Sequence, residues 1–566
     1  MKDRKWEVLG KLGKGKNKVG DVLEVIFENR GLKSEKERGE FMNSFHPKDL
    51  DFHELGLKKS GILAAVKRIK LAKERGESVI VYGDYDADGI CSTAVLWEAL
   101  YVLGLNCLPF IPNRFNDGYG INLKSVEKIL ENNSDLKLIV TVDNGITANK
   151  EIEKIKTKGI DVIVSDHHQQ GEKLPRVSAI VHSLKLCGSS VAWILARELY
   201  REFEKEKCID NGLDLVAIGS IADQMSYVGV NRSFIKWGLL SLQQTSRVGL
   251  LALIKSMGVE REKISSYTVG FMIAPRLNAT GRMDTALDSL RLVCAKNIKK
   301  VEELTINMNK KNQERQNAVL ESLELINGKK RSVPQDLVFV SDRKLHEGII
   351  GLLASNLAEK YFLPAVVVSV GEVYAKGSAR SIPGVNIIKA IKELDKYLIA
   401  GGGHPMAAGF TIKTSDIKPF SLKLTKIIKS LLTPNLKVKK VLIDLEVGFD
   451  LIDWDLFSSL ENLSPFGIDN PSPVFLTRDV EVLEFKKVGE GGKHLKLKVK
   501  HFGREYDAIG FGLGERNDLG DKIDIVYNLE KNTWNNRESL QLKIEDIRKS
   551  EEFLKSWDKE IYGERI

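Results

Sequence analysis

Four short apolar runs in the first half of the chain each lead into acidic residues. They are Val79–Gly89, Leu136–Gly145, Asp161–His168 and Leu213–Asp223. Unbroken runs of β-branched apolar residues are typical of strands that are buried on both faces of a parallel sheet. Segments with helical spacing separate the runs, for example Ile90–Leu103. The pattern therefore predicts a succession of β-α-β units around a mostly parallel sheet.

The polar residues at the ends of these runs form a candidate site. The first run carries three acids at alternating positions, and one of the later runs adds two adjacent histidines. Because ligands of open α/β sheets bind at the carboxyl ends of the strands, we expect these side chains to line one edge of the sheet. The set is Asp84, Asp86, Asp88, Asp143, His167, His168 and Asp223.

A bound cation explains this concentration of acids. Carboxylates that are held close together repel one another unless a cation neutralises them. A solvated acidic turn would explain the first run alone, but not the recurrence of acids after three further runs. Hard divalent ions, Mg²⁺ or Mn²⁺, suit oxygen ligands, and an imidazole shifts the preference toward Mn²⁺ over Ca²⁺.

The set is large enough to hold two ions about 3.5–4 Å apart, which activate water for attack on phosphorus. The adjacent histidines leave two interpretations open: both bind, or one binds and the other is a hydrogen-bonding neighbour.

The composition is that of a globular protein with several domains. A length of 566 residues predicts three or four domains at about 150 residues each. A hydrophobic content of 43% and a charged content of 29% exclude a disordered or fibrous chain. The first residues lack the apolar core of a signal peptide, and no stretch approaches about 18 uninterrupted apolar residues, so we expect a cytoplasmic protein. Five cysteines without CxxC spacing indicate neither a zinc ribbon nor a disulfide framework. The net charge of +9 permits a polyanionic partner without proving one.

The remaining segments predict further elements. The basic run Gly10–Lys18 lacks the P-loop pattern and a strand ahead of it, so we expect a flexible terminus there. Lys296–Gly328 is long, charged and free of proline, which predicts one long helix. Apolar strands within Pro334–Gly409 indicate a second α/β domain, and alternation after Lys440 indicates a small β-barrel. We also expect helices at Ile62–Arg75, Leu123–Glu131 and Asn149–Lys158, and a strand at Asn106–Arg114.

The site motifs, taken in their order along the chain, resemble the DHH phosphoesterase superfamily. These motifs are DYDADG, VDNG, DHH and the segment that ends in Asp223. Within that superfamily, further segments resemble the RecJ single-stranded-DNA exonucleases. They are IPNRFNDGYG at Ile111–Gly120, APRLNATGRM at Ala274–Met283, HEGIIG at His346–Gly351, KGSARS at Lys376–Ser381, GGGHPMAAGF at Gly401–Phe410 and SPFGIDNPSPVF at Ser464–Phe475. The resemblance runs from about Gly61 to near Ile547.

The resemblance implies an α/β fold class with a DHH domain built on a mostly parallel sheet, a long connecting helix, an α/β DHHA1 domain and a C-terminal barrel of OB type. The implied divisions are an N-terminal extension (1–60), the catalytic DHH domain (61–295), the connecting helix (296–330), the DHHA1 domain (331–432) and the nucleic-acid-binding OB-fold (433–566). A basic stretch in the last segment fits a barrel that tracks a nucleic-acid backbone. It consists of Lys486, Lys487, Lys493, His494, Lys496, Lys498 and Lys500.

The resemblance also implies how the ions are held. One ion is expected between Asp86 and Asp143, and Asp143 then bridges to a second ion whose other ligands are Asp88, His167 and Asp223. Many superfamily members have a histidine four residues before the first ligand acid, but Tyr82 stands there in this chain. A neutral phenol is a poor ligand for a hard cation, so Asp84 is expected as a ligand or as a neighbour of one. His168 is expected to contact a non-bridging phosphate oxygen.

Substrate contacts are implied on further segments. Arginines clamp phosphate bidentately, and the resemblance assigns a terminal phosphate to Arg114, Ser378 and Arg380, with Arg276 and Arg282 nearby. A surface polar contact or ion pair is the alternative for each of them. His404, which follows three glycines, is either a substrate contact or a structural residue. Bases are expected to stack on aromatic side chains, for which the candidates are Tyr119, Phe466 and Trp534, although core packing is the commoner role of such residues.

The first functional hypothesis is a metal-dependent 5′→3′ exonuclease that degrades single-stranded DNA to 5′-mononucleotides in DNA repair and recombination. The implied partners are single-stranded DNA, a single-strand-binding protein and a helicase, and the chain is expected to act as a monomer. A second hypothesis keeps the catalytic site but assigns short oligonucleotides, cyclic dinucleotides or pyrophosphate as substrate. A third is a non-catalytic scaffold that binds single strands at replication forks.

Overall fold

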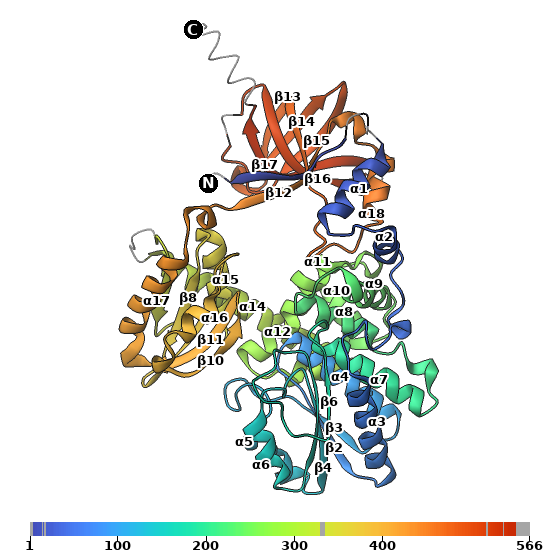
Figure 1. Cartoon of the computed structure of the whole chain (residues 1–566). Coiled ribbons are helices and arrows are strands. Elements are labelled where there is room, and N and C mark those ends of the chain that lie inside the picture. Colours follow the sequence, from blue (N-terminus) through green and yellow to red (C-terminus); the bar gives the residue numbers. More distant parts are fainter. Residues whose placement is uncertain are drawn as a thin grey trace. The chain divides into compact units, whose positions relative to one another are not determined.

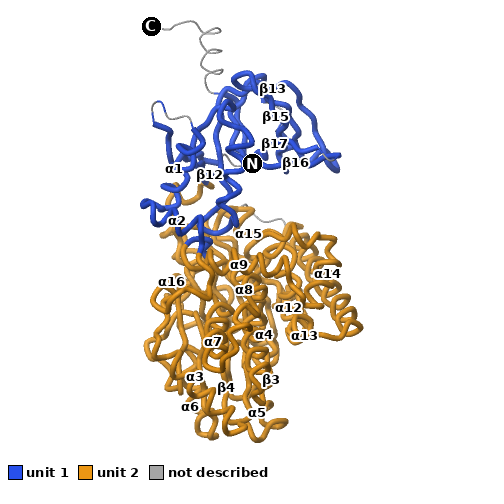
Figure 2. The backbone as a smooth tube through the Cα atoms, turned by 90° about the vertical axis from the view of Figure 1, so that its right-hand side faces the viewer, with its two compact units in different colours: residues 1–44, 226–228, 440–566 blue, residues 45–225, 229–439 orange. Residues whose placement is uncertain are grey.

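The computed structural model describes residues 4–13, 15, 18–328, 334–516, 519–535 and 537–550. The chain divides into two compact units (Figure 2). Unit 1 consists of residues 1–44, 226–228 and 440–566, and unit 2 consists of residues 45–225 and 229–439. Within the described ranges, no helix has both the length and the apolarity to cross a lipid bilayer.

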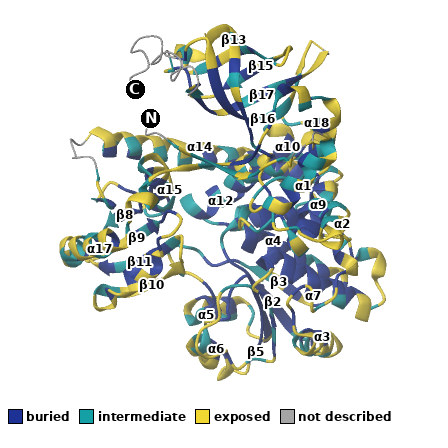
Figure 3. Ribbon diagram, turned by 45° about the horizontal axis from the view of Figure 1, so that its top comes forward, coloured by how far each residue is buried: buried dark blue, intermediate teal, exposed yellow. Residues whose placement is uncertain are grey.

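Unit 2 begins with a five-stranded sheet in the order β3-β2-β4-β5-β6, with every neighbouring pair parallel. The strands are β2 (Ser78–Tyr82), β3 (Cys107–Phe110), β4 (Leu136–Val142), β5 (Asp161–Asp166) and β6 (Ala179–His182). All five residues of β2 are buried, as its unbroken apolar run predicts, and the centre of the sheet is dark blue in Figure 3. The predicted parallel sheet is therefore confirmed.

Helices cover both faces of this sheet (Figure 1). One face carries α3 (Lys59–Glu74), α4 (Ala87–Val102) and α7 (Gly188–Glu202), and the other carries α5 (Leu123–Asn132) and α6 (Asn149–Lys156). Val126, Ile129 and Ile152 of α5 and α6 pack with Ile139 and Val162 of the strands in one apolar cluster. The helices predicted from spacing at these positions are confirmed.

The fourth apolar run is not a strand. Residues Leu213–Ala222 form helix α8, and Asp223 caps its C-terminus, so the predicted strand end is wrong. Every residue from Leu213 to Ile221 is buried. A helix that is buried on all sides has no polar stripe, and its apolar run is therefore indistinguishable from that of a buried strand.

Helices continue through the middle of unit 2. They are α9 (Gly229–Gln243), α10 (Val248–Ser256), α11 (Ser266–Thr268), a π-helical turn (Val269–Ile273), α12 (Ala274–Met283), α13 (Leu287–Cys294) and α14 (Ile298–Gly328). The 31 residues of α14 confirm the predicted long helix. Near its start α14 packs on α10, α12 and α13, and near its end it packs on α15 (Ile350–Tyr361).

The second sheet of unit 2 has the order β10-β11-β9-β8-β7. Its strands are β7 (Val338–Asp342), β8 (Ala365–Val370), β9 (Tyr374–Arg380), β10 (Leu398–His404) and β11 (Ala407–Lys413). Two apolar clusters lie on it, one with α15 and the other with α16 (Ile387–Lys392) and α17 (Ile417–Leu431). The second α/β domain that the sequence predicts is confirmed.

Unit 1 contains a closed five-stranded barrel, in which β13 pairs with both β14 and β16. Its strands are β13 (Phe475–Val488), β14 (His494–His501), β15 (Arg504–Gly510), β16 (Lys522–Trp534) and β17 (Arg537–Lys549), with α18 (Trp454–Glu461) beside them. The predicted C-terminal barrel is confirmed.

The N-terminal segment belongs to the same unit as the barrel. Strand β1 (Lys5–Gly10) pairs in parallel with β12 (Lys440–Glu446), and α1 (Val19–Asn29) packs into the barrel's apolar core, followed by α2 (Glu35–Met42). Arg30 is a buried link, because its guanidinium lies 3.0 Å from Asp444 Oδ1. The expectation that no strand precedes the run Gly10–Lys18 is wrong, because β1 ends at Gly10. Lys14, Lys16 and Asn17 of this run lie outside the described residues.

Candidate active site and metal centre

The first three acids lie where β2 passes into α4. Asp86 is the N-cap of α4, and its Oδ1 accepts a hydrogen bond of 3.0 Å from the Gly89 amide. Asp88 lies in the first helical turn, where the positive end of the helix dipole favours a carboxylate. Asn278 Oδ1 in α12 accepts a hydrogen bond of 2.9 Å from the Ala87 amide. The loop is therefore fixed from both sides.

The other site residues come from three further elements. Asp143 follows β4 and has a φ of 62°, a left-handed conformation that asparagine and aspartate tolerate better than most residues. His167 and His168 follow β5, which ends at Asp166. Asp223 follows α8 rather than a strand.

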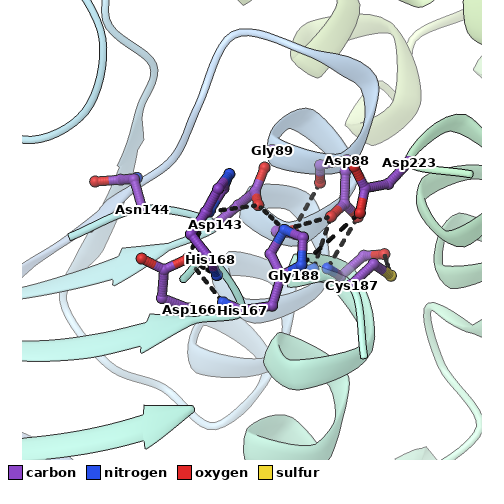
Figure 4. Close-up of polar contacts among 12 residues, drawn as sticks. Asp88, Gly89, Asp143, Asn144, Asp166, His167, His168, Cys187, Gly188 and Asp223 are labelled. Atoms are coloured by element: carbon purple, nitrogen blue, oxygen red, sulfur yellow. Dashed lines mark hydrogen bonds and ion pairs between the residues drawn. The ribbon is translucent and has the colours of Figure 1, made fainter. Parts of the chain in front are cut away.

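The structure brings all seven predicted residues together in three groups whose ligand atoms lie within 4.8 Å of one another. The groups are Asp84 with Asp86 and Asp143, Asp143 with His167 and His168, and Asp88 with His167 and Asp223. His167 lies at the centre, with Nε2 3.0 Å from Asp143 Oδ1 and Nδ1 3.8 Å from Asp223 Oδ2. Figure 4 shows five of these side chains, Asp88, Asp143, His167, His168 and Asp223, gathered beyond the ends of the strands.

The donor atoms of this cluster fit a hard divalent cation. Asp84 Oδ1 and Asp143 Oδ1 are buried and accept no hydrogen bond from the described residues. Burial, followed by the charges of neighbouring acids, raises the pKa of Asp84 and of Asp143 well above its usual value. The same causes raise the pKa of Asp223 to about 8. A cation among the carboxylates would bind the unpaired oxygens and favour the ionised form of each acid.

His167 and His168 have different surroundings. Burial lowers the pKa of His167, so its imidazole is neutral and its nitrogens are free to bind a metal. His168 Nδ1 lies 2.8 Å from Asp166 Oδ1, and its Nε2 lies 3.1 Å from the Tyr119 hydroxyl. Burial opposes protonation of His168, but the hydrogen bond to Asp166 and the negative charges of Asp166, Asp223 and Asp84 together outweigh it and raise the pKa of His168 to about 9.

Asp166 is a site residue that the sequence interpretation missed. Its carboxylate accepts hydrogen bonds from the amides of Ile146, His167 and His168, in addition to the His168 ring. Burial opposes ionisation of Asp166, yet these hydrogen bonds lower its pKa. The available signal was its position directly before the two histidines.

Tyr82 points into the protein core. Its hydroxyl donates a hydrogen bond of 3.1 Å to the Gly120 carbonyl, and its ring packs 5.1 Å from that of Phe110. The Tyr82 hydroxyl is thus engaged by a backbone carbonyl, whereas Asp84 belongs to one of the three ligand groups. The geometry thus favours Asp84 over Tyr82 as the extra group of the first ion site.

Asp88 is held by the N-terminus of α7, which the sequence interpretation did not foresee. Its Oδ2 accepts a hydrogen bond of 2.7 Å from the Gly188 amide, and its Oδ1 accepts one of 3.0 Å from the Ser189 amide. A Cβ atom at Gly188 would lie 2.6 Å from the Asp143 side chain. Glycine is therefore required for the close approach of this helix to two site acids.

Arginines gather beside the Asp84 end of the cluster. The guanidinium of Arg114 lies 5.0 Å from the centre of the Tyr85 ring, and Arg380 Nη1 donates a hydrogen bond of 3.2 Å to Ser378 Oγ. Burial, followed by the nearby charges of Arg114, Arg315 and Arg380, lowers the pKa of Arg282 to about 10. We call Arg114, Arg282 and Arg380 the arginine cluster. Repulsion within such a group of half-buried like charges is relieved by an anion.

Two predicted substrate contacts lie elsewhere. Arg276 donates hydrogen bonds to Asn309 Oδ1 and to the Met272 carbonyl, at 2.9 and 2.8 Å. His404 is exposed at the end of β10. Among the described residues, no hydrogen bond or ion pair links it to the arginine cluster.

The predicted base-stacking residues differ among themselves. Tyr119 contacts His168, Phe466 packs against the barrel core, and Trp534 is 73% exposed on β16. The basic stretch is partly neutralised, because Lys486 pairs with Glu484 and Lys498 pairs with Glu505.

Comparisons with known proteins agree with this architecture. Three family models match: the DHH family, N-terminal domain at residues 78–220, the DHHA1 domain at 335–430 and the RecJ OB domain at 443–546. The single-stranded-DNA-specific exonuclease RecJ of Bacillus subtilis is 36% identical over 89% of this chain, which spans 65% of that relative's length. RecJ of Escherichia coli is 31% identical over 93% of this chain and 95% of its own length.

Solved structures show the same fold. The crystal structure of RecJ from Thermus thermophilus in complex with Mn²⁺ matches with a TM-score of 0.81 and 27% identity, over 97% of this chain and 80% of that one. RecJ of the same organism with Mg²⁺ matches with a TM-score of 0.77 and 26% identity, over 97% of this chain and 79% of that one. The predicted fold class is confirmed. The order of the domains, the acid cluster and the identity over nearly the full length of the E. coli relative show that this chain belongs to the RecJ family of single-stranded-DNA-specific exonucleases.

Proposed function

We propose that this chain hydrolyses single-stranded DNA from its 5′ end, releases 5′-mononucleotides and uses two divalent ions, Mn²⁺ or Mg²⁺. The observation that carries the proposal is the meeting of six potential ligands and His168 in three groups whose ligand atoms lie within 4.8 Å of one another. Two buried carboxylate oxygens of these groups accept no hydrogen bond from the described residues.

The ligands divide between two ion positions. Asp84, Asp86 and Asp143 would hold one ion, and Asp88, Asp143, His167 and Asp223 would hold the other, so that Asp143 bridges them. When bound, such a pair of ions places positive charge at the scissile phosphate and lowers the pKa of a water molecule. The hydrogen bonds from the Gly188 and Ser189 amides hold the Asp88 carboxylate of the second set in place in the ion-free protein.

His168 contributes a charge to the same site. In the ion-free protein its pKa is raised to about 9, and the hydrogen bond to Asp166 fixes the orientation of the ring. A protonated imidazole beside the phosphate stabilises the negative charge that develops on a non-bridging oxygen during attack.

The arginine cluster would determine polarity. Arg114, Arg282 and Arg380, together with the Ser378 hydroxyl, offer charged donors for a terminal phosphate next to Asp84 and Asp86. A 5′-phosphate bound there places the first phosphodiester over the ions and leaves the rest of the strand to continue beyond them.

The six ligands and His168 argue against a scaffold without catalysis, and the barrel of unit 1 argues against a substrate of only two or three nucleotides. A single-strand-binding protein, a helicase, a monomeric state and a cytoplasmic location stay predictions.

The test is digestion of a 5′-phosphorylated single-stranded oligonucleotide with a 3′ label, in Mn²⁺, in Mg²⁺ and in chelator, beside a duplex. Asp143→Asn removes the bridging carboxylate, so we expect a loss of about 10³-fold or more in cleavage rate. Asp135→Asn is the matched control, because Asp135 is exposed just ahead of β4 whereas Asp143 follows its other end. Binding without cleavage in either ion would support the scaffold instead.

A further inference from the structure

Tyr267 and Phe271 form an exposed pair of stacked rings in unit 2. Their ring centroids are 4.8 Å apart and the rings are inclined by only 24°. The two residues are 66% and 70% exposed. Large aromatic side chains are normally buried, because each gains free energy when its apolar surface leaves water. This pair instead presents a flat π-surface to solvent.

The pair lies on one continuous helical segment, Ser266–Met283, which includes a π-helical turn at Val269–Ile273. Residues four apart are neighbours on a helix surface, which explains why the rings of Tyr267 and Phe271 meet. Val269 and Ile273 face the other way and are fully buried, so the segment is anchored by its apolar face. Single π-turns of this kind are frequent at functional sites.

The same segment passes along the acid cluster. A Cβ atom at Gly270 would lie 3.6 Å from Ile221 in α8, two residues before Asp223. Further along, Asn278 accepts the hydrogen bond from the Ala87 amide, and a Cβ atom at Gly281 would lie 2.6 Å from the Tyr85 carbonyl oxygen. The ring pair therefore lies near the Asp223 end of the cluster, and the later part of the segment lies near the Asp86 end.

The charges around the site define a direction. The arginine cluster lies beside Tyr85, which stands between Asp84 and Asp86: the guanidinium of Arg114 is 5.0 Å from the centre of the Tyr85 ring, and Arg282 directly follows Gly281, which contacts the Tyr85 carbonyl. Asp223 is adjacent to Asp88 and His167 at the opposite end. A strand with its 5′-phosphate on the arginines and its first phosphodiester at the ions would leave the site past Asp223.

We propose that Tyr267 and Phe271 form a stacking platform for an unpaired base on the 3′ side of the scissile phosphate. This inference rests on the proposed function, because it takes single-stranded DNA as the substrate and the arginine cluster as the position of its 5′ end. Every base has a π-face, so such a platform holds the strand without sequence preference. A base inside a duplex is already stacked on both faces, so the platform favours single strands.

A docked protein would also cover an exposed aromatic pair. DNA is favoured because the helical segment that carries the rings also carries Asn278 and Arg282, which contact the catalytic loop or belong to the arginine cluster.

The test measures base stacking directly. The full-length chain carries Asp143→Asn so that bound strands stay intact, and the probes are 5′-phosphorylated oligonucleotides with one 2-aminopurine at position 2, 3, 4, 5 or 6. In Mn²⁺ we expect fluorescence quenching at one or two of these positions. Phe271→Ala should abolish that quenching and weaken binding about 5- to 100-fold, the equivalent of one stacked base. Phe271→Trp should retain the quenching and the affinity. With an abasic nucleotide at the quenched position, Phe271→Ala should change the affinity very little, because there is no base to stack.

Tyr101→Ala is the matched control, because Tyr101 is 62% exposed and pairs with Trp97 at a centroid distance of 5.8 Å at the far end of α4. Equal quenching and affinity in Phe271→Ala and in Tyr101→Ala would overturn the platform and leave a protein partner as the occupant. Failure of the unmodified chain to cut any single strand would overturn the proposed function itself, whereas cleavage with an unaffected Phe271→Ala would overturn the platform alone.

Discussion

Asp223 is a partly exposed member of the acid cluster, with 34% of its side chain accessible to solvent. Its pKa is still raised to about 8, first by burial and then by the charges of Asp88 and Asp86. An aspartate in an unfolded chain has a pKa of about 3.9. Between these two values the folded protein binds a proton that the unfolded chain has lost, so the ionisation of Asp223 reduces the stability of the metal-free protein as the pH rises.

The first prediction concerns Asp223→Asn in the presence of chelator. At pH 8 the variant should melt at a higher temperature than the unmodified chain, by about 2 °C, because it lacks the unfavourable charge. At pH 4.5 the two should melt together. With Mn²⁺ at pH 8 the order should reverse, because a cation that binds only the folded state stabilises it. Differential scanning calorimetry at both pH values checks this, with the exposed Asp210→Asn as control. A melting difference that does not change with pH would contradict it.

At the scale of elements, the site depends on helices that approach one another through glycine. A Cβ atom at Gly219 of α8 would lie 2.2 Å from Ser189 Oγ and 2.3 Å from Asp88 Oδ1. Ser189 belongs to the first turn of α7, whose amides hold Asp88. Glycine at position 219 thus allows α4, α7 and α8 to approach one another. Helix α4 carries the ligand Asp88, and α8 directly precedes the ligand Asp223.

The second prediction is that Gly219→Ala displaces the Asp88 carboxylate. We expect the affinity for Mn²⁺ to fall about 10-fold or more, since the ligand can no longer accept both amides of α7, and the cleavage rate to fall with it. Titration of Mn²⁺ by calorimetry and a cleavage assay check this. Gly39→Ala is the control, because Gly39 is also helical but has no atom within 4 Å of an added Cβ. Unchanged ion affinity in Gly219→Ala would show that Asp88 is not a ligand.

The elements also show how far sequence patterns reach. Strands β2, β4 and β5 were predictable because their apolar runs end at turns that carry acids, and their neighbours follow a helical period. Helix α8 was not predictable, because a helix buried on every side loses the polar stripe that reveals its period. The contacts of Asp88 with Gly188 and Ser189 join residues about 100 positions apart, and only the folded chain brings them together.

At the scale of the molecule, unit 1 is assembled from segments at opposite ends of the chain. Lys5 of β1 pairs with Lys440 of β12, and Val22, Ile26 and Phe27 of α1 are buried in the same apolar cluster as the barrel strands. Between them, the Tyr227 amide donates a hydrogen bond of 2.8 Å to the Ile468 carbonyl. No local pattern links the N-terminal segment to a barrel that follows more than 400 residues later, which is why the sequence alone indicated a separate extension.

The last prediction follows from this division. Deletion of residues 441–566 alone would leave β1 without its partner strand and expose the apolar face of α1, so we expect that product to aggregate. A fragment of residues 45–439 retains both sheets of unit 2 with their own apolar clusters, the six potential metal ligands and His168. It should melt cooperatively and cleave a 5′-phosphorylated trinucleotide at a rate within about threefold of the full chain, since the ion ligands and the arginine cluster are intact.

The affinity of the fragment for a 30-nucleotide strand, and the dependence of that affinity on salt, should both fall, because lysines of the barrel no longer contribute phosphate contacts. Fluorescence anisotropy at two salt concentrations measures this difference. A fragment that binds the long strand as tightly as the full chain would show that the barrel is not a DNA-binding arm.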